Sequence, residues 1–194
     1  ADFPIKEMVR AIMSKRKNHK KSGKQGRNTP SSGNFSAWLF GTHAVLAALG
    51  NPKRQCQRLA IASQTANDLE PLVVDAAQLG GHDNLVVEIR DKNELSALLP
   101  PNAVHQGVAL LSAPLESPHI EDLCKRAENL KSATVVVLDQ ATDPHNVGAV
   151  MRSALAFGAL AVVVQDRHAP DITGTLAKSA SGAVEKLDYI KATN

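Results

Sequence analysis

The sequence predicts an α/β protein with helices packed on a sheet, and two observations favour that class. Apolar residues make up 43% of the 194 residues but aromatic residues only 3%. A core of Ala, Val, Leu and Ile suits buried strands packed against helices better than a β-sandwich. From Trp38 onward, strand-like and helix-like segments also alternate. We expect a small α/β unit over residues 37–113, a linker and helix over 114–131, and a second unit over 132–194.

The first unit is predicted from short segments of changing periodicity. "GTHAVLAALG" is typical of a helix that has Thr42 near its start and Gly50 just after its end. The apolar run "RLAIA" that follows suits a buried strand. The other expected elements are a helix over 68–79, a strand over 85–89, a short helix over 91–99, a strand over 107–111, and, after a connector with Pro114 and Pro118, a helix in "IEDLCKRAENL".

The second unit begins with "ATVVVLD", an apolar run without alternation that predicts a strand buried on both faces. A helix over 147–157, ended by Gly158, and a strand in "LAVVVQD" follow. Strand, helix and strand within so short a stretch indicate a right-handed crossover between parallel strands. A further helix near 172–180 and a short strand in "KLDYI" complete this unit.

Basic residues are concentrated at the start of the chain. Residues 1–36 hold nine Lys or Arg against two acidic residues, a balance of +7, so the total of +3 leaves −4 for the rest. This stretch is polar and lacks apolar periodicity, so we expect a disordered arm. The arm either attracts nucleic-acid phosphates or only increases solubility. Its candidate RNA contacts are Lys15, Arg16, Lys17, Lys20 and Lys21.

Several functional classes lack their sequence features. No apolar run is long enough to cross a bilayer, and the start lacks the apolar segment of a secretory signal, so we expect a soluble, cytoplasmic protein. Cys56 and Cys124 lie far apart without a CxxC pair, and the histidines are scattered singly. We therefore expect no metal site and no disulfide framework.

The turn after "VVVLD" carries an unusual set of polar residues, in "DQATDPHNVGAVMRSALAFGA". It lies at the carboxyl end of a predicted parallel strand, where ligands bind in open α/β sheets. Asn146 could cap the next helix, and Arg152 could hold a phosphate or carboxylate. The alternative is an Asx-Pro turn, a capping Asn and a solvated Arg. The signatures of dinucleotide, nucleoside-triphosphate and serine-hydrolase sites are missing.

This turn resembles the first signature of the SpoU (TrmH) family of RNA ribose 2'-O-methyltransferases, with its Asp-Pro-x-Asn-x-Gly turn and following Arg. "AKSASGAVEKLDYIKATN" is similar to the family stretch that follows, and "WLFGTHAVLAAL" and "VHQGVALL" resemble the ends of the family's substrate-binding domain. The resemblance implies a ribosomal-protein-like RNA-binding domain before a knotted, parallel-sheet SPOUT domain. It also implies S-adenosylmethionine as methyl donor, a homodimer, and large-subunit rRNA, at a guanosine, as substrate.

The same resemblance suggests roles for single residues. Asn146 and Arg152 match the family's Asn and Arg on the RNA and reaction side of the site. His43 is a further candidate RNA contact, with a local hydrogen bond as the alternative. Arg54 could continue a basic surface toward RNA or be merely solvated. Trp38 is expected to anchor packing rather than stack on a base.

Two later family signatures, which form the methyl-donor pocket, do not occur before Asn194. We therefore expect the front part of a longer enzyme, which alone neither closes the knot nor binds S-adenosylmethionine well and is inactive. The rival hypothesis is a noncatalytic RNA-binding or ribosome-assembly protein of the same fold.

Overall fold

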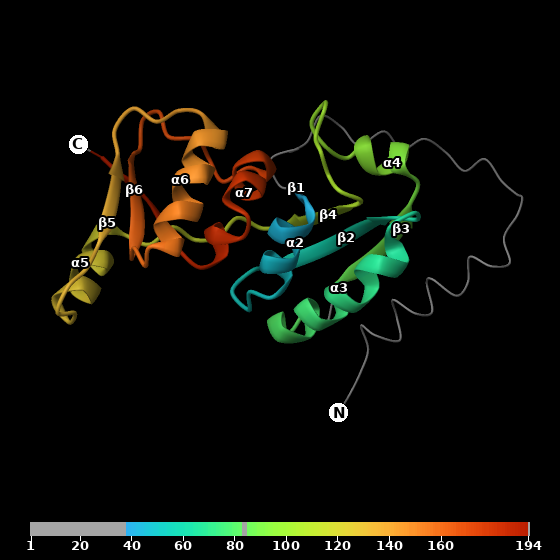
Figure 1. Ribbon diagram of the computed structural model, residues 1–194, viewed down its shortest axis with the longest axis horizontal. Coiled ribbons are helices and arrows are strands. Elements are labelled where there is room, and N and C mark those ends of the chain that lie inside the picture. Colours follow the sequence, from blue (N-terminus) through green and yellow to red (C-terminus); the bar gives the residue numbers. More distant parts are fainter. Residues whose placement is uncertain (1–37, 83–84, 194) are drawn as a thin grey trace, which may run out of the picture.

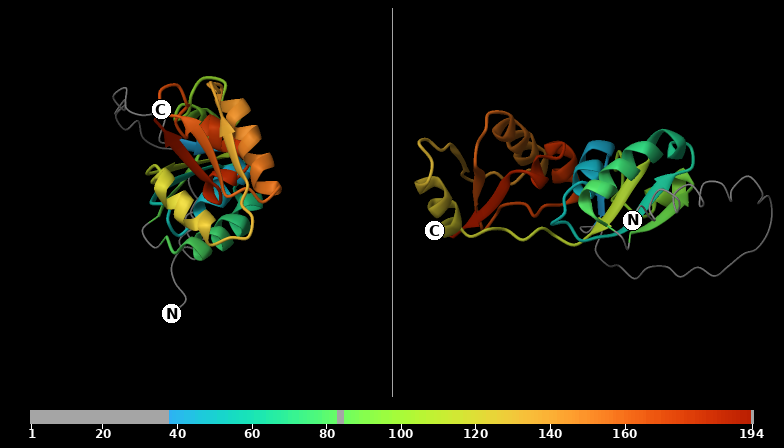
Figure 2. Two further views of the ribbon diagram at one scale, coloured as in Figure 1. Left: turned by 90° about the vertical axis from the view of Figure 1, so that its left-hand side faces the viewer. Right: turned by 90° about the horizontal axis from the view of Figure 1, so that it is seen from below.

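The molecule is elongated and consists of two sheet-containing units placed end to end (Figures 1 and 2). The structure is a computed structural model that describes residues 38–82 and 85–193. The predicted basic arm lies outside these residues. Helix α7 of the second unit lies beside β1 and α2 of the first, so the two units meet at this helix (Figure 1).

The first unit is built on a mixed four-stranded sheet in the order β1-β4-β2-β3. Strands β2 and β3 are parallel, whereas β4 is antiparallel to both β1 and β2. Strand β1 has no counterpart among the predicted elements. The bounds are Trp38–Phe40 for β1, Cys56–Ala62 for β2, Val86–Arg90 for β3 and Val108–Ser112 for β4.

Three helices accompany this sheet, at α2 (Thr42–Leu49), α3 (Ala66–Gly80) and α4 (Lys92–Ser96). Their positions confirm the three helices predicted here. Helices α2 and α3 bury residues of the main core on one face. On the other face a smaller cluster forms around Trp38, which is buried and therefore packs as expected. Within the described residues, no helix combines the length and apolarity that crossing a membrane needs.

The second unit has a three-stranded sheet that is parallel throughout, in the order β5-β6-β7. Helix α6 connects β5 to β6, which confirms the predicted parallel crossover. Helix α5 buries Leu123 against one face of the sheet, and α6 and α7 cover the other. The bounds are α5 Ile120–Glu128, β5 Val135–Leu138, α6 Pro144–Ala156, β6 Ala161–Gln165, α7 Gly174–Ala180, the 3₁₀ helix η3 Ala183–Glu185 and β7 Asp188–Ala192.

Strand β5 corrects one prediction. The run "VVVL" is not buried on both faces, because β5 is an edge strand whose side chains alternate between exposed and half-buried. Val137 is 71% exposed, and Phe157, just beyond the end of α6, is 87% exposed. The apolar run without alternation forms an edge strand here and not a central one. The position of a strand in its sheet depends on pairing with strands far along the chain, which the run itself does not specify.

Candidate functional site

Helix α6 begins earlier than predicted, and a different residue caps it. The side chain of Asp143 accepts a hydrogen bond from the backbone N–H of His145 at 3.0 Å. Pro144 follows at the first helical position, where its missing N–H removes no helical hydrogen bond. Asn146 therefore lies within the first turn of α6 and is not the cap, contrary to the prediction. Its side-chain amide is left free for another partner.

Asn146 and Arg152 both lie on the exposed part of α6. Neither side chain forms a hydrogen bond or ion pair with another residue in the described part of the chain. Six helical positions separate them, which is about 9 Å along the axis and about 120° around it. Their donors thus face solvent on the helix that follows the carboxyl end of β5.

Helix α7 crosses α6 closely, and Gly148 makes this possible. A Cβ atom at Gly148 would lie 2.6 Å from Cβ of Ser179 and 2.7 Å from the carbonyl oxygen of Leu176. Near this crossing, Nδ1 of His145 lies 3.1 Å from the Ser179 hydroxyl oxygen. His145 itself is exposed. The crossing thus fixes the exposed start of α6 against α7.

The first unit contributes polar groups to the same region. Lys178 of α7 donates a hydrogen bond from Nζ to the carbonyl oxygen of Val104 at 2.7 Å. Next to it, Oε1 of Gln106 accepts from the backbone N–H of Thr42 at 3.0 Å. His43 follows in the first turn of α2, where its ring is exposed and has no polar partner among the described residues. Sequence reasoning missed Lys178, because only tertiary packing brings it to the first unit.

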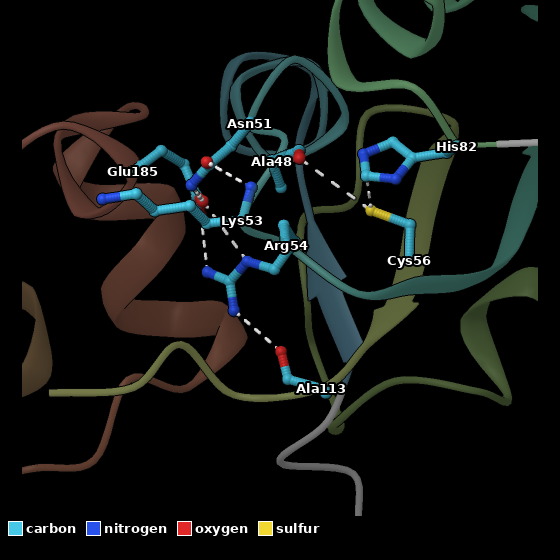
Figure 3. A network of polar contacts seen from close by, with 8 residues as sticks. All are labelled: Ala48, Asn51, Lys53, Arg54, Cys56, His82, Ala113 and Glu185. Carbon is cyan, nitrogen blue, oxygen red and sulfur yellow. Dashed lines mark hydrogen bonds and ion pairs between the residues drawn. The ribbon is translucent and has the colours of Figure 1, made fainter.

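Arg54 was expected to be exposed, and this prediction is wrong. The residue is only 3% exposed, and its guanidinium donates to the Glu185 carboxylate and to the Ala113 carbonyl oxygen (Figure 3). It therefore belongs to the boundary between the units and not to a basic surface. The candidates Lys15, Arg16, Lys17, Lys20 and Lys21 lie outside the described residues.

The cavity beside α6 and β5 does not suit a charged cofactor. It has a volume of about 460 Å³ and is lined mainly by apolar side chains, with the hydroxyls of Thr134 and Ser153 as its polar side-chain groups. S-adenosylmethionine carries a carboxylate, an ammonium and an adenine, which need charged or amide partners. These residues alone do not supply them. No cluster of three or more His, Cys, Asp and Glu side chains suited to a metal occurs in residues 38–82 and 85–193.

Comparison with known families accounts for both units. Residues 133–194 match the SpoU rRNA Methylase family, and residues 38–118 match the family described as RNA 2'-O ribose methyltransferase substrate binding. The chain belongs to the SpoU family. The Asp-Pro-x-Asn turn, Asn146 and Arg152 all lie within the SpoU methylase match.

Curated SpoU relatives are similar over most of this chain. An uncharacterised tRNA/rRNA methyltransferase of Synechocystis is 37% identical over 80% of the chain, and the 23S rRNA (guanosine-2'-O-)-methyltransferase RlmB of Photobacterium profundum is 31% identical over 80%. The chain spans 40% and 62% of the lengths of these two proteins.

Solved structures show the same fold. The SpoU methyltransferase AviRb of Streptomyces viridochromogenes, in complex with AdoMet, aligns with a TM-score of 0.60 and 18% identity over 81% of this chain and 55% of its own. An AdoMet-bound rRNA methyltransferase of Sinorhizobium meliloti aligns with a TM-score of 0.60 and 19% identity, over 98% of this chain and 62% of its own. Both neighbours support a SpoU-type α/β fold for the two units.

Proposed function

We propose that this chain is part of an RNA methyltransferase that transfers a methyl group from S-adenosylmethionine to a ribose 2'-hydroxyl. The observation that carries the proposal is the pair Asn146 and Arg152, which are exposed on α6 within the SpoU methylase match and have no polar partner among residues 38–82 and 85–193. The substrate we propose is large-subunit rRNA, at a guanosine, because RlmB of Photobacterium profundum bears that name. A cytoplasmic location accompanies this substrate.

Arg152 would act on the RNA side of the reaction. A guanidinium stays protonated at any physiological pH and is a poor base. Its planar donors instead suit the phosphate next to the target ribose and the negative charge that develops on the attacking oxygen. Asn146, about 1.7 helical turns earlier, can donate to and accept from the same nucleotide through its amide. S-adenosylmethionine would supply the electrophilic methyl group.

The first unit would bind the RNA that surrounds the target nucleotide. It matches the substrate-binding family over residues 38–118, and next to Gly41 it brings Gln106 close to Lys178 of the second unit, with the exposed His43 in the adjoining first turn of α2. RNA loops are recognised mainly through shape and splayed bases, for which side-chain amides and rings are suitable partners. We also propose that the complete enzyme is a homodimer.

A noncatalytic RNA-binding or ribosome-assembly role is the second candidate. It is favoured by the apolar cavity beside α6, which lacks partners for a charged cofactor. In this case Asn146 and Arg152 would contact RNA without chemistry.

Calorimetry with S-adenosylmethionine separates the two functions. The titration is made on this chain and on a version that includes whatever coding sequence follows Asn194 in the natural gene. We expect binding only by the extended version, followed by transfer of radiolabelled methyl to rRNA. Binding by neither version, with RNA affinity retained, would support the noncatalytic role. Tight binding by this chain alone would show that the residues described above do form a cofactor pocket.

A further inference from the structure

One ion pair between the two units is buried. Arg54 follows α2 in the first unit, and Glu185 lies in η3 of the second, 131 positions later (Figure 3). Nη2 of Arg54 lies 2.5 Å from Oε1 of Glu185, and Nε lies 3.3 Å from Oε2. The two side chains are only 2% and 4% exposed. The geometry is bidentate, which gives Arg–carboxylate pairs their orientational specificity.

Further hydrogen bonds complete the surroundings of both charges. Nδ2 of Asn51 donates to Oε2 of Glu185 at 2.8 Å, and Nη1 of Arg54 donates to the Ala113 carbonyl oxygen at 3.0 Å (Figure 3). Ala113 opens the connector between the units, so the pair also holds the start of this connector. A buried pair is tolerated when its remaining polar groups are satisfied in this way.

The packing around the pair is close. Strand β1 and helix α2 both contact α7. At Gly174, the first residue of α7, an added Cβ would overlap the carbonyl oxygen and the ring of the β1 residues Trp38 and Phe40. Lys178 of the same helix binds the Val104 carbonyl oxygen. The units therefore meet through several contacts, and within residues 38–82 and 85–193 the Arg54–Glu185 pair is the one with two buried charges.

We propose that the Arg54–Glu185 pair fixes the orientation of the first unit on the second, and that both are positioning residues for RNA. A different docking that covered these side chains without pairing them would leave a buried charge unpaired, which is far more costly than losing a surface ion pair. The fixed orientation keeps Gln106 and His43 in one arrangement relative to α6. The RNA part of this inference rests on the proposed function, whereas the docking part does not.

Distances between two spin labels test the docking. One label is placed on Cys124, an exposed thiol on α5, and one on Leu79→Cys, at an exposed position of α3. Burial raises the pKa of the half-buried Cys56 to about 12, so this thiol stays protonated and labels poorly near neutral pH. Pulsed electron paramagnetic resonance then reports the distance distribution between the units.

Three variants distinguish loss of the Arg54–Glu185 ion pair from a general effect of substitution. Glu185→Leu leaves Arg54 buried without a counter-charge, whereas Arg54→Met with Glu185→Leu removes both charges. Arg58→Met is the matched control, because Arg58 pairs with Glu88 inside the first unit. We expect a narrow distribution for the parent and the control, a broad one for Glu185→Leu, and a narrower one again for the double variant.

Two results would overturn the docking role: a Glu185→Leu distribution as narrow as the parent's, or a double variant at least as broad as the single one. Should Glu185→Leu fail to fold by circular dichroism, Glu185→Gln, which preserves the side-chain shape, takes its place in the same comparison.

RNA affinity tests the positioning role on the same proteins, with purified large-subunit rRNA as the probe. We expect Glu185→Leu to weaken binding by about tenfold and the double variant to recover most of it, although neither residue is exposed. Unchanged affinity in a variant with a broad distance distribution would overturn the positioning role. If the parent itself binds no rRNA, the proposed function fails, and the spin-label distances still decide the docking.

Discussion

Arg54 and Arg152 are the same residue type, but their surroundings give them different roles. Arg54 is buried, and a carboxylate and a carbonyl oxygen accept its hydrogen bonds. Arg152 is exposed on α6 and has no partner in the described part of the chain. An unpaired guanidinium on a helix of mostly small, apolar residues contributes little to folding, which fits the anion-binding role that we propose for Arg152.

Replacement of Arg152 should therefore separate activity from stability. In the complete enzyme we expect Arg152→Ala to reduce methyl transfer to rRNA by about a hundredfold or more, as the loss of one charge-stabilising donor does in other enzymes. Its urea unfolding midpoint should stay within error of the parent's. The control is Arg167→Ala, which removes another exposed guanidinium of the second unit that has no polar partner among the described residues. Turnover equal to the parent's would remove Arg152 from the site.

His105 should make stability depend on pH. The ring is buried; its Nδ1 accepts from the Gly107 N–H at 3.1 Å, and its Nε2 lies 3.1 Å from the Ser96 hydroxyl oxygen. Burial, and secondarily the charges of Lys92 and Lys178, lower the pKa of His105 below its usual 6.5. The folded state thus binds this proton less readily than the unfolded state. Stability is full above about pH 6.5 and falls as the pH drops toward the lowered pKa.

Urea unfolding at pH 7.5 and pH 5.5 measures this effect, and His105→Gln, which cannot take up the proton, is the comparison. The parent should lose more unfolding free energy than the variant between the two values. Titration of Glu88 does not contribute to the difference between these two pH values. Burial alone would raise its pKa, but hydrogen bonds from Arg90 and Arg58 outweigh burial and hold the pKa below 4.5, so its contribution changes at lower pH. Equal losses in parent and variant would contradict the assignment.

At the scale of elements, the crossing of α6 and α7 depends on the missing side chain of Gly148. A Cβ there would come within 2.6–2.9 Å of Ser179, Leu176 and Ala180, two of these contacts being with backbone atoms that cannot move aside. Gly148→Ala should therefore destabilise the second unit by about 1–3 kcal/mol, despite the higher helix propensity of Ala. Gly50→Ala is the control, because its Cβ would make ordinary contacts of 3.4 Å or more. Chemical denaturation that ranks the two variants equally would disprove the close crossing.

Strand β5 has an unpaired edge in the described structure, with Val137 and, beyond α6, Phe157 exposed. Exposed apolar edge strands favour association between chains. We expect this chain to self-associate at micromolar concentrations and Val137→Lys to weaken the association severalfold, as measured by sedimentation velocity. Leu79→Lys, at an exposed position on α3, should change little. A monomeric parent would show that this edge alone does not bring chains together.

The elements also show which features a sequence can predict. Helix α2 and the parallel β5–α6–β6 crossover follow from local periodicity and end signals, and the structure confirms them. The start of α6 was predicted three residues late because Asn146 and Asp143 are both good caps, and sequence does not choose between them. The exposure of β5 and the burial of Arg54 depend on partners far along the chain. Such long-range pairings leave no local pattern.

On the scale of the whole molecule, charge is divided unequally along the chain. Residues 1–36 carry a balance of +7, whereas the remaining residues carry −4. Because residues 37–194 are slightly acidic on balance, their net charge gives no general attraction for phosphates. The basic stretch is therefore the main candidate for the electrostatic part of RNA affinity, while the shape of the two docked units would set where on the RNA the protein binds.

Removal of residues 1–36 should reduce both RNA affinity and its dependence on salt. Each lost phosphate contact lowers the slope of log K against log salt by about 0.7 for single-stranded RNA, so four or five lost contacts change it by about three. The measurement is a fluorescence titration with rRNA at several KCl concentrations. As a control, the 194-residue chain with Gln at Lys15, Arg16, Lys17, Lys20 and Lys21 keeps the length and removes these five charges. It should show a similarly flattened slope. A slope unchanged in both proteins would mean that this stretch only increases solubility, because neutralised phosphates are the source of the salt dependence.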